Sequence, residues 1–189
     1  MKQLPYPIVR DMVRSGDGLF FRGHEFPATA ILKFTDLSHV AMIVRYDEMM
    51  PHYNDQCVQT VEVLTDGLRP HFFSERVRDE ILAGNDVYWL KVHLTNEQRA
   101  LCREYAMVEI PKSKSYGFGT LVSMAFGYHP IDGVKNWVCS EWYGSILISC
   151  GLVDWQVAPK PGDIPKWLGP RAGDLVKIIG PKLNELEVE

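Results

Sequence analysis

Three residues far apart in the chain, His39, Glu62 and Cys139, form a set that could carry out acyl transfer. A cysteine thiolate can attack a carbonyl carbon, and an imidazole can move the proton that the thiol and the leaving group exchange. A carboxylate beside the imidazole orients the ring and favours its charged form. The three residues can act together only if the elements that carry them bring them to one place.

The first two residues lie in predicted neighbouring strands. Ser38-His39-Val40-Ala41-Met42-Ile43-Val44 is typical of a strand, and residues 57–64 predict the next one. A hairpin whose loop centres on Met50-Pro51 would place His39 directly opposite Glu62, on the same face and at cross-strand contact distance. We therefore expect an imidazole–carboxylate pair.

Cys139 begins a predicted helix, residues 139–150, which ends before Gly151. The positive end of the helix dipole lowers the pKa of a thiol at this position, and the unpaired N–H groups of the first turn can bind an oxyanion. Glu141 opposes the thiolate unless it points outward. Each of the three residues also has an ordinary interpretation, as a structural histidine, a solvent-facing glutamate or a packed cysteine.

The other cysteines, Cys57, Cys102 and Cys150, are predicted to be packing residues. Cys150 lies at the far end of the helix that Cys139 begins, where the dipole disfavours a thiolate. No CxxC pair exists and no cysteine has zinc-ligand spacing from a histidine, so we predict no metal site. Asp17, in Ser15-Gly16-Asp17, is predicted to be a turn residue whose carboxylate accepts backbone N–H groups.

The elements that must position these residues predict an α+β fold, with a mostly antiparallel sheet packed against helices. Thr95 and Gln98 form a capping-box pair at the start of a predicted helix, in which Leu101, Tyr105 and Val108 recur at helical spacing. We expect one domain over residues 1–189, with a frayed tail at 181–189. The predicted strands are 18–22, 39–46, 57–64, 87–92 and 175–179, and the predicted helices are 95–109, 139–150 and a shorter one at 118–126.

Composition excludes several classes of protein. The chain has 189 residues, 46% of them hydrophobic, and a net charge of −4, which argues against a disordered chain and against a nucleic-acid partner. The apolar runs are too short for a transmembrane segment. The amino end lacks the apolar core of a signal peptide, so we expect a cytoplasmic protein as synthesised. The oligomeric state is not predicted.

Several motifs, in this order, resemble those of the circularly permuted NlpC-type papain-like cysteine peptidases. In that superfamily the histidine strand precedes the cysteine helix, as it does here. The motifs are Ser15-Gly16-Asp17-Gly18-Leu19-Phe20-Phe21, Ser38-His39-Val40-Ala41-Met42-Ile43-Val44, Val58 to Leu64, Lys114-Ser115-Tyr116-Gly117-Phe118 and Val138-Cys139-Ser140-Glu141.

The resemblance implies a permuted papain-like fold with Cys139 as nucleophile, His39 as base and Glu62 as the third polar residue, with Tyr116 at the rim of the substrate cleft. It implies a cysteine hydrolase that forms a thioacyl intermediate on a small peptide or acyl substrate, such as a peptidoglycan fragment, and that needs no cofactor. A cell-wall substrate would require release by lysis, a phage particle or dedicated secretion. The alternatives are an acyl hydrolase or acyltransferase on lipid esters or thioesters, as in the lecithin–retinol acyltransferase group, and a non-catalytic binding module.

Overall fold

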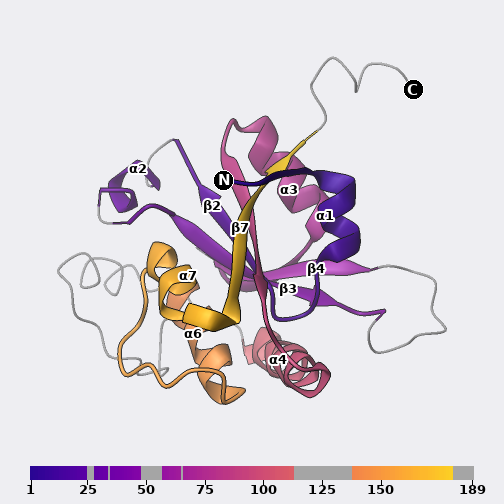
Figure 1. Cartoon of the computed structure of the whole chain (residues 1–189), viewed down its shortest axis with the longest axis vertical. Coiled ribbons are helices and arrows are strands. Elements are labelled where there is room, and N and C mark those ends of the chain that lie inside the picture. Colours follow the sequence, from indigo (N-terminus) through magenta and orange to yellow (C-terminus); the bar gives the residue numbers. More distant parts are fainter. Residues whose placement is uncertain (25–27, 34, 48–56, 65, 113–137, 181–189) are drawn as a thin grey trace.

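A seven-stranded mixed sheet runs through the molecule (Figure 1). The structure is a computed structural model and describes residues 1–24, 28–33, 35–47, 57–64, 66–112 and 138–180. The strand order is β1-β7-β6-β2-β3-β4-β5; β1 and β7 are parallel, and the other neighbours are antiparallel. The strands are β1 (Gln3–Pro5), β2 (Gly18–Arg22), β3 (His39–Arg45), β4 (Val58–Leu64), β5 (Gly67–Phe72), β6 (Asp86–Val92) and β7 (Ala172–Ile179).

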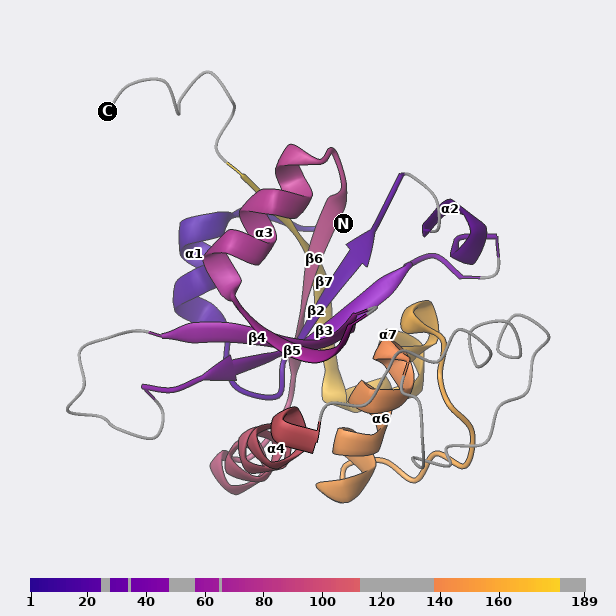
Figure 2. The ribbon, with the colours of Figure 1, turned by 180° about the vertical axis from the view of Figure 1, so that it is seen from behind.

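Helices cover both faces of this sheet (Figure 2). On one face lie α1 (Tyr6–Met12) and α3 (Phe73–Leu82), and on the other lie α4 (Asn96–Glu109) and α6 (Cys139–Ser149). The shorter helices are α2 (Ala28–Ile31), α7 (Ile164–Trp167) and three 3₁₀ turns at Ile110–Lys112, Pro161–Asp163 and Gly169–Arg171.

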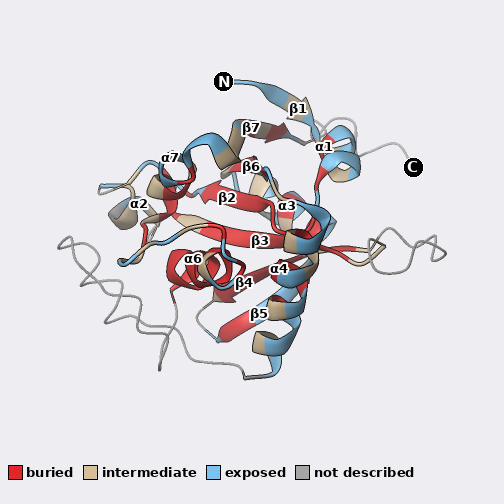
Figure 3. Cartoon of the chain, turned by 60° about the horizontal axis from the view of Figure 1, so that its bottom comes forward, coloured by how far each residue is buried: buried red, intermediate tan, exposed pale blue. Residues whose placement is uncertain are grey.

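Strand β3 shows why two cores form. Alternate side chains of a strand point to opposite faces. Val40 and Met42 therefore pack with α4 and α6, whereas Ala41 and Ile43 pack with α1 and α3. Because helices cover both faces of the sheet, β3 has a continuous run of apolar residues rather than alternating apolar and polar ones. Figure 3 shows this strand as buried.

The sequence-based elements are confirmed wherever the structure describes them, with ends that differ from the prediction by at most three residues. Thr95 caps α4 through the predicted capping box. Of the predicted apolar repeat of α4, Leu101 and Val108 are exposed and Tyr105 is partly buried against the core, whereas Cys102 and Ala106 are fully buried. The predicted helix 118–126, Tyr116 and the tail 181–189 lie outside the described residues.

The predicted register of the β3–β4 pair is wrong by two residues. Met42 pairs with Val61 and Ile43 with Thr60, so the ladder would place Ala41, rather than His39, opposite Glu62. An even shift returns each side chain to the same face, so His39 and Glu62 remain on one side of the sheet. Such a long connection leaves register free to shift, since it imposes no turn geometry on the pair.

Within the described part of the chain, no helix is long and apolar enough to span a membrane.

Candidate active site

His39 and Glu62 meet where the β3–β4 ladder stops. Its last pair is Met42–Val61, and Glu62 lies one position past it and His39 three. The His39 ring nitrogen Nε2 is 2.7 Å from Oε2 of Glu62, a diagonal contact across the two strands. The Glu62 side chain is fully buried and that of His39 is 17% exposed. The pair is therefore largely shielded from water, which strengthens its electrostatic interaction.

Cys139 reaches His39 from the other face of the sheet. It is the first residue of α6 and packs in the core that α4 and α6 share, whereas Ala41 and Ile43, which share a face of β3 with His39, belong to the opposite core. The Cys139 thiol hydrogen-bonds the His39 side chain, whose Nε2 atom faces Glu62. The imidazole thus lies between a carboxylate and a sulfur.

Two backbone N–H groups also hydrogen-bond the Cys139 sulfur, from Ser140 and Val40. The Ser140 N–H belongs to the first turn of α6, which has no intrahelical acceptor for it. The Ile43 N–H bonds the carbonyl of Asp17 on the β2 side, so alternation turns the Val40 N–H toward β4. The β3–β4 ladder has ended there, and this N–H is free to serve the sulfur.

The charges of the three residues support one another. Burial opposes ionisation of Cys139, but His39 and the two N–H groups outweigh it and lower the pKa of the thiol. Burial also lowers the pKa of His39, yet Cys139 and Glu62 together raise it to about 10. Burial would raise the pKa of Glu62, whereas His39 and Arg76 lower it to about 2. The arrangement therefore favours a thiolate, an imidazolium and a carboxylate.

Glu62 accepts hydrogen bonds from further donors. Arg76, on α3, binds both of its oxygens, with Nε 2.7 Å from Oε1 and Nη2 3.0 Å from Oε2. The Thr60 hydroxyl lies 3.4 Å from Oε1. Phe21 lies beneath the pair: its ring is 5.5 Å from the His39 ring and 4.6 Å from the Arg76 guanidinium carbon. The carboxylate is thus held from two sides while it faces the imidazole.

The structure brings together three of the four residues that the sequence singled out, His39, Glu62 and Cys139, whereas Tyr116 lies outside the described residues. Glu141 is buried rather than turned outward, and the pKa of Cys139 is lowered all the same. Sequence reasoning missed Arg76. Its one local signal is its position between Phe73 and Val77, the buried residues of α3, and a surface arginine beside such a stripe looks the same.

No group of three or more histidine, cysteine, aspartate or glutamate side chains within the described ranges is arranged to hold a metal ion.

Comparisons with known proteins give a structural likeness but no sequence match. No protein-family model and no curated protein sequence matches the chain. Among solved structures, it is similar to the metalloprotein YiiX of Escherichia coli O157:H7 (DUF1105), with a TM-score of 0.54 and 17% identity. The alignment covers 72% of this chain and 66% of YiiX, just under two thirds of that protein. At this identity the likeness concerns the fold alone.

Proposed function

We propose that the chain is a cysteine hydrolase with a permuted papain-like, NlpC-type fold, in which Cys139, His39 and Glu62 cleave amide bonds through a thioacyl intermediate. The observation that carries the proposal is the position of the His39 ring, which has Glu62 at Nε2 and is hydrogen-bonded to the side chain of Cys139. The matching order of the motifs in the sequence adds support, and extends the proposal to peptide amides such as those of bacterial cell walls.

The reaction begins with the ion pair. The Cys139 thiolate attacks the carbonyl carbon, and a C–S bond forms as the carbonyl oxygen becomes an oxyanion. The N–H groups of Ser140 and Val40, already directed at the sulfur, are available to this oxygen. The His39 imidazolium then gives a proton to the leaving nitrogen, and the C–N bond breaks.

Water completes the cycle. Neutral His39 takes a proton from the water as its oxygen attacks the thioester carbon, and the C–S bond breaks to release the carboxylic acid and the thiolate. Glu62 keeps the ring oriented through Nε2 and stabilises its charge in both halves of the reaction.

The name of YiiX raises the question of a metal. Both oxygens of Glu62 already accept N–H groups, and two of these come from a guanidinium, which repels a metal cation. The side chains present therefore do not fit a metal ion as ligands, and the proposed mechanism uses no metal.

The test compares wild type with Cys139→Ala on purified cell-wall peptides and on a panel of lipid esters. Peptide cleavage that falls by roughly 10³-fold or more in Cys139→Ala is expected. Cleavage of lipid esters alone would replace the substrate class, and turnover retained without the thiol would overturn the mechanism. A Cys139 that alkylates with iodoacetamide at an ordinary pKa of about 8.5 would point instead to a binding module.

A further inference from the structure

Arg76 is the most heavily engaged side chain around the proposed triad. Its Nε and Nη2 atoms bind the two oxygens of Glu62 side by side, at 2.7 Å and 3.0 Å. Its remaining nitrogen, Nη1, binds the carboxylate of Glu80 one helical turn away. A paired fork of this kind sets the plane of a carboxylate as well as its position.

The surroundings of Arg76 hold it in this place. Its guanidinium lies over the Phe21 ring, and Phe21 pairs directly with His39 across β2 and β3. Asn85 donates to Glu80 at 2.7 Å and accepts the backbone N–H of His24 at 3.0 Å. A continuous line of hydrogen bonds therefore leads from His39 through Glu62, Arg76 and Glu80 to the loop that follows α3.

We propose that Arg76 is a positioning residue, which holds the Glu62 carboxylate ionised and aimed at Nε2 of His39. This inference rests on the proposed function and adds a fourth member to its site. A fully buried carboxylate that faced only an imidazole and a hydroxyl at 3.4 Å would have one charged partner, and burial would favour its protonation. Arg76 supplies the second charged partner, and Glu80 balances the cation so that its charge bears less on His39.

The inference predicts a change in how the thiol responds to pH. Without Arg76, only His39 opposes the effect of burial, so the pKa of Glu62 rises and the carboxylate becomes protonated at a higher pH. Protonated Glu62 supports the His39 imidazolium less well, so Cys139 becomes harder to ionise. The acid limb of Cys139 alkylation, which requires no substrate, should therefore move to higher pH in Arg76→Gln. An arginine that serves stability alone would leave this limb where it is.

The experiment measures iodoacetamide alkylation of Cys139 against pH, assigned by peptide mapping, in wild type, Arg76→Gln, Arg76→Lys, Glu62→Gln and the double variant Glu62→Gln/Arg76→Gln. Arg76→Lys keeps the charge, so its acid limb should return toward that of wild type. On a cleaved substrate it should lose about tenfold to a hundredfold in kcat, with little change in KM, because a lysine cannot reproduce the fork. The double variant should match Glu62→Gln alone, since Arg76 acts through Glu62.

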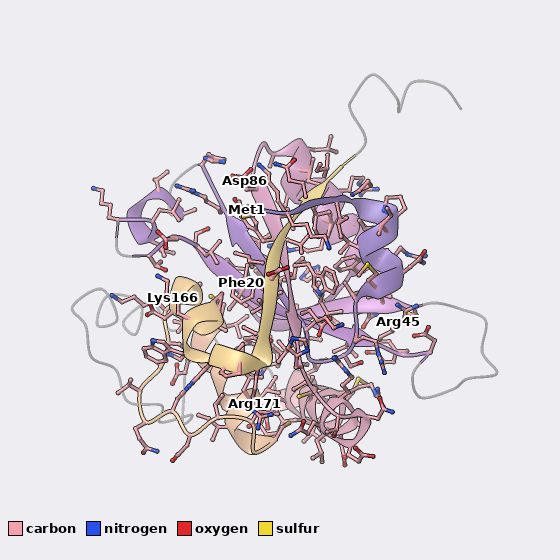
Figure 4. All side chains as sticks on the ribbon, in the orientation of Figure 1. Met1, Phe20, Arg45, Asp86, Lys166 and Arg171 are labelled. Atoms are coloured by element: carbon pink, nitrogen blue, oxygen red, sulfur yellow. The ribbon has the colours of Figure 1, made fainter. Side chains whose placement is uncertain are left out.

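Arg45→Gln is the matched control. Arg45 is also a buried arginine, bound to Asp47 and to the carbonyls of Arg10, Asp11 and Val13, but it ends β3 at the opposite end from His39, near the rim of the molecule (Figure 4). The Arg45→Gln variant should lose stability without a shift in the acid limb of Cys139 alkylation. An unshifted limb in Arg76→Gln overturns the inference, and if that variant does not fold, an unchanged kcat in Arg76→Lys does so. An ordinary thiol in wild type would instead overturn the proposed function.

Discussion

Two buried carboxylates in this molecule each meet an arginine, and they differ in what else they meet. Glu62 faces Arg76 and the titratable ring of His39. Asp17 faces Arg99 at 3.1 Å and accepts N–H groups from Trp89, Val92 and the backbone of Arg14. Both carboxylate side chains are fully buried. The two networks use the same kind of ion pair in different surroundings.

The difference appears in their pKa values. For Asp17, burial raises the pKa, and Arg99 with the three N–H donors does not fully offset it. For Glu62, His39 and Arg76 overcome burial and lower the pKa to about 2. Asp17 joins β2 to β6 and α4 through these contacts, none of which involves His39 or Cys139. Glu62 contacts the His39 ring, which in turn interacts with Cys139. A charged partner that can itself gain or lose a proton turns a structural ion pair into one that can support chemistry.

The largest expected effect is the loss of stability when the Asp17 carboxylate is replaced. Asp17→Asn presents an amide N–H₂ to donors that need an acceptor and leaves the buried Arg99 guanidinium without its carboxylate. The free energy of unfolding should fall by about 3 to 5 kcal/mol, measured by urea denaturation. Folded molecules should keep the Cys139 alkylation profile.

Asp66→Asn is the matched control, because Asp66 forms an exposed pair with Arg69. Pairs of this kind contribute less than about 1 kcal/mol. If Asp17→Asn and Asp66→Asn lowered the free energy of unfolding equally, the Asp17 network would not be a structural element of the fold.

Much of the site could be predicted from the sequence, because the relevant signals are local. The strand of His39, the strand of Glu62 and the start of the Cys139 helix each follow from a few neighbouring residues, and the two-residue register error left the faces unchanged. Arg76 could not be found in this way. Its role depends on β5 returning the chain so that α3 crosses above Glu62, and no local pattern specifies that crossing.

In α4, local sequence patterns likewise predict one feature correctly and miss another. Its capping box specified where it begins, but Leu101 and Val108 of its apolar repeat are exposed. The buried stripe instead contains Arg99, whose guanidinium binds Asp17 and the carbonyls of Ser15 and Val92. Hydrophobic periodicity ranks side chains by polarity and misses a charged residue that is buried because its partners are buried with it.

When the pH is lowered, the contributions of the two carboxylates to the free energy of unfolding should change in opposite directions. The folded-state pKa of Glu62, about 2, lies below its ordinary value of 4.5, so its contribution is present above pH 4.5 and is lost as the pH falls through 2. The difference in unfolding free energy between wild type and Glu62→Gln should therefore shrink on acidification, by about 3 kcal/mol in full.

For Asp17 the folded-state pKa lies above its ordinary value, so its ionisation costs the folded state free energy as the pH rises through the folded pKa. The difference between wild type and Asp17→Asn should therefore grow as the pH is lowered. Urea denaturation of the three proteins from pH 6 downward measures both trends. Two differences that change in the same direction would remove the distinction drawn between the networks.

The smallest expected effects on stability come from removing the uncharged hydrogen-bond donors of the two carboxylates. Trp89 donates its indole N–H to Asp17 at 3.0 Å, whereas Thr60 lies 3.4 Å from Glu62, at the limit of hydrogen-bond range. Trp89→Phe should cost about 1 to 2 kcal/mol of unfolding free energy, since Asp17 has only one charged partner and loses a buried donor. Thr60→Val keeps the shape of the side chain and should cost less than about 0.5 kcal/mol, because Glu62 retains His39 and both arginine contacts. Urea denaturation at neutral pH measures both variants. If Thr60→Val were the more costly of the two, Glu62 would depend on its neutral donor as Asp17 does, and charge alone would not account for its ionisation.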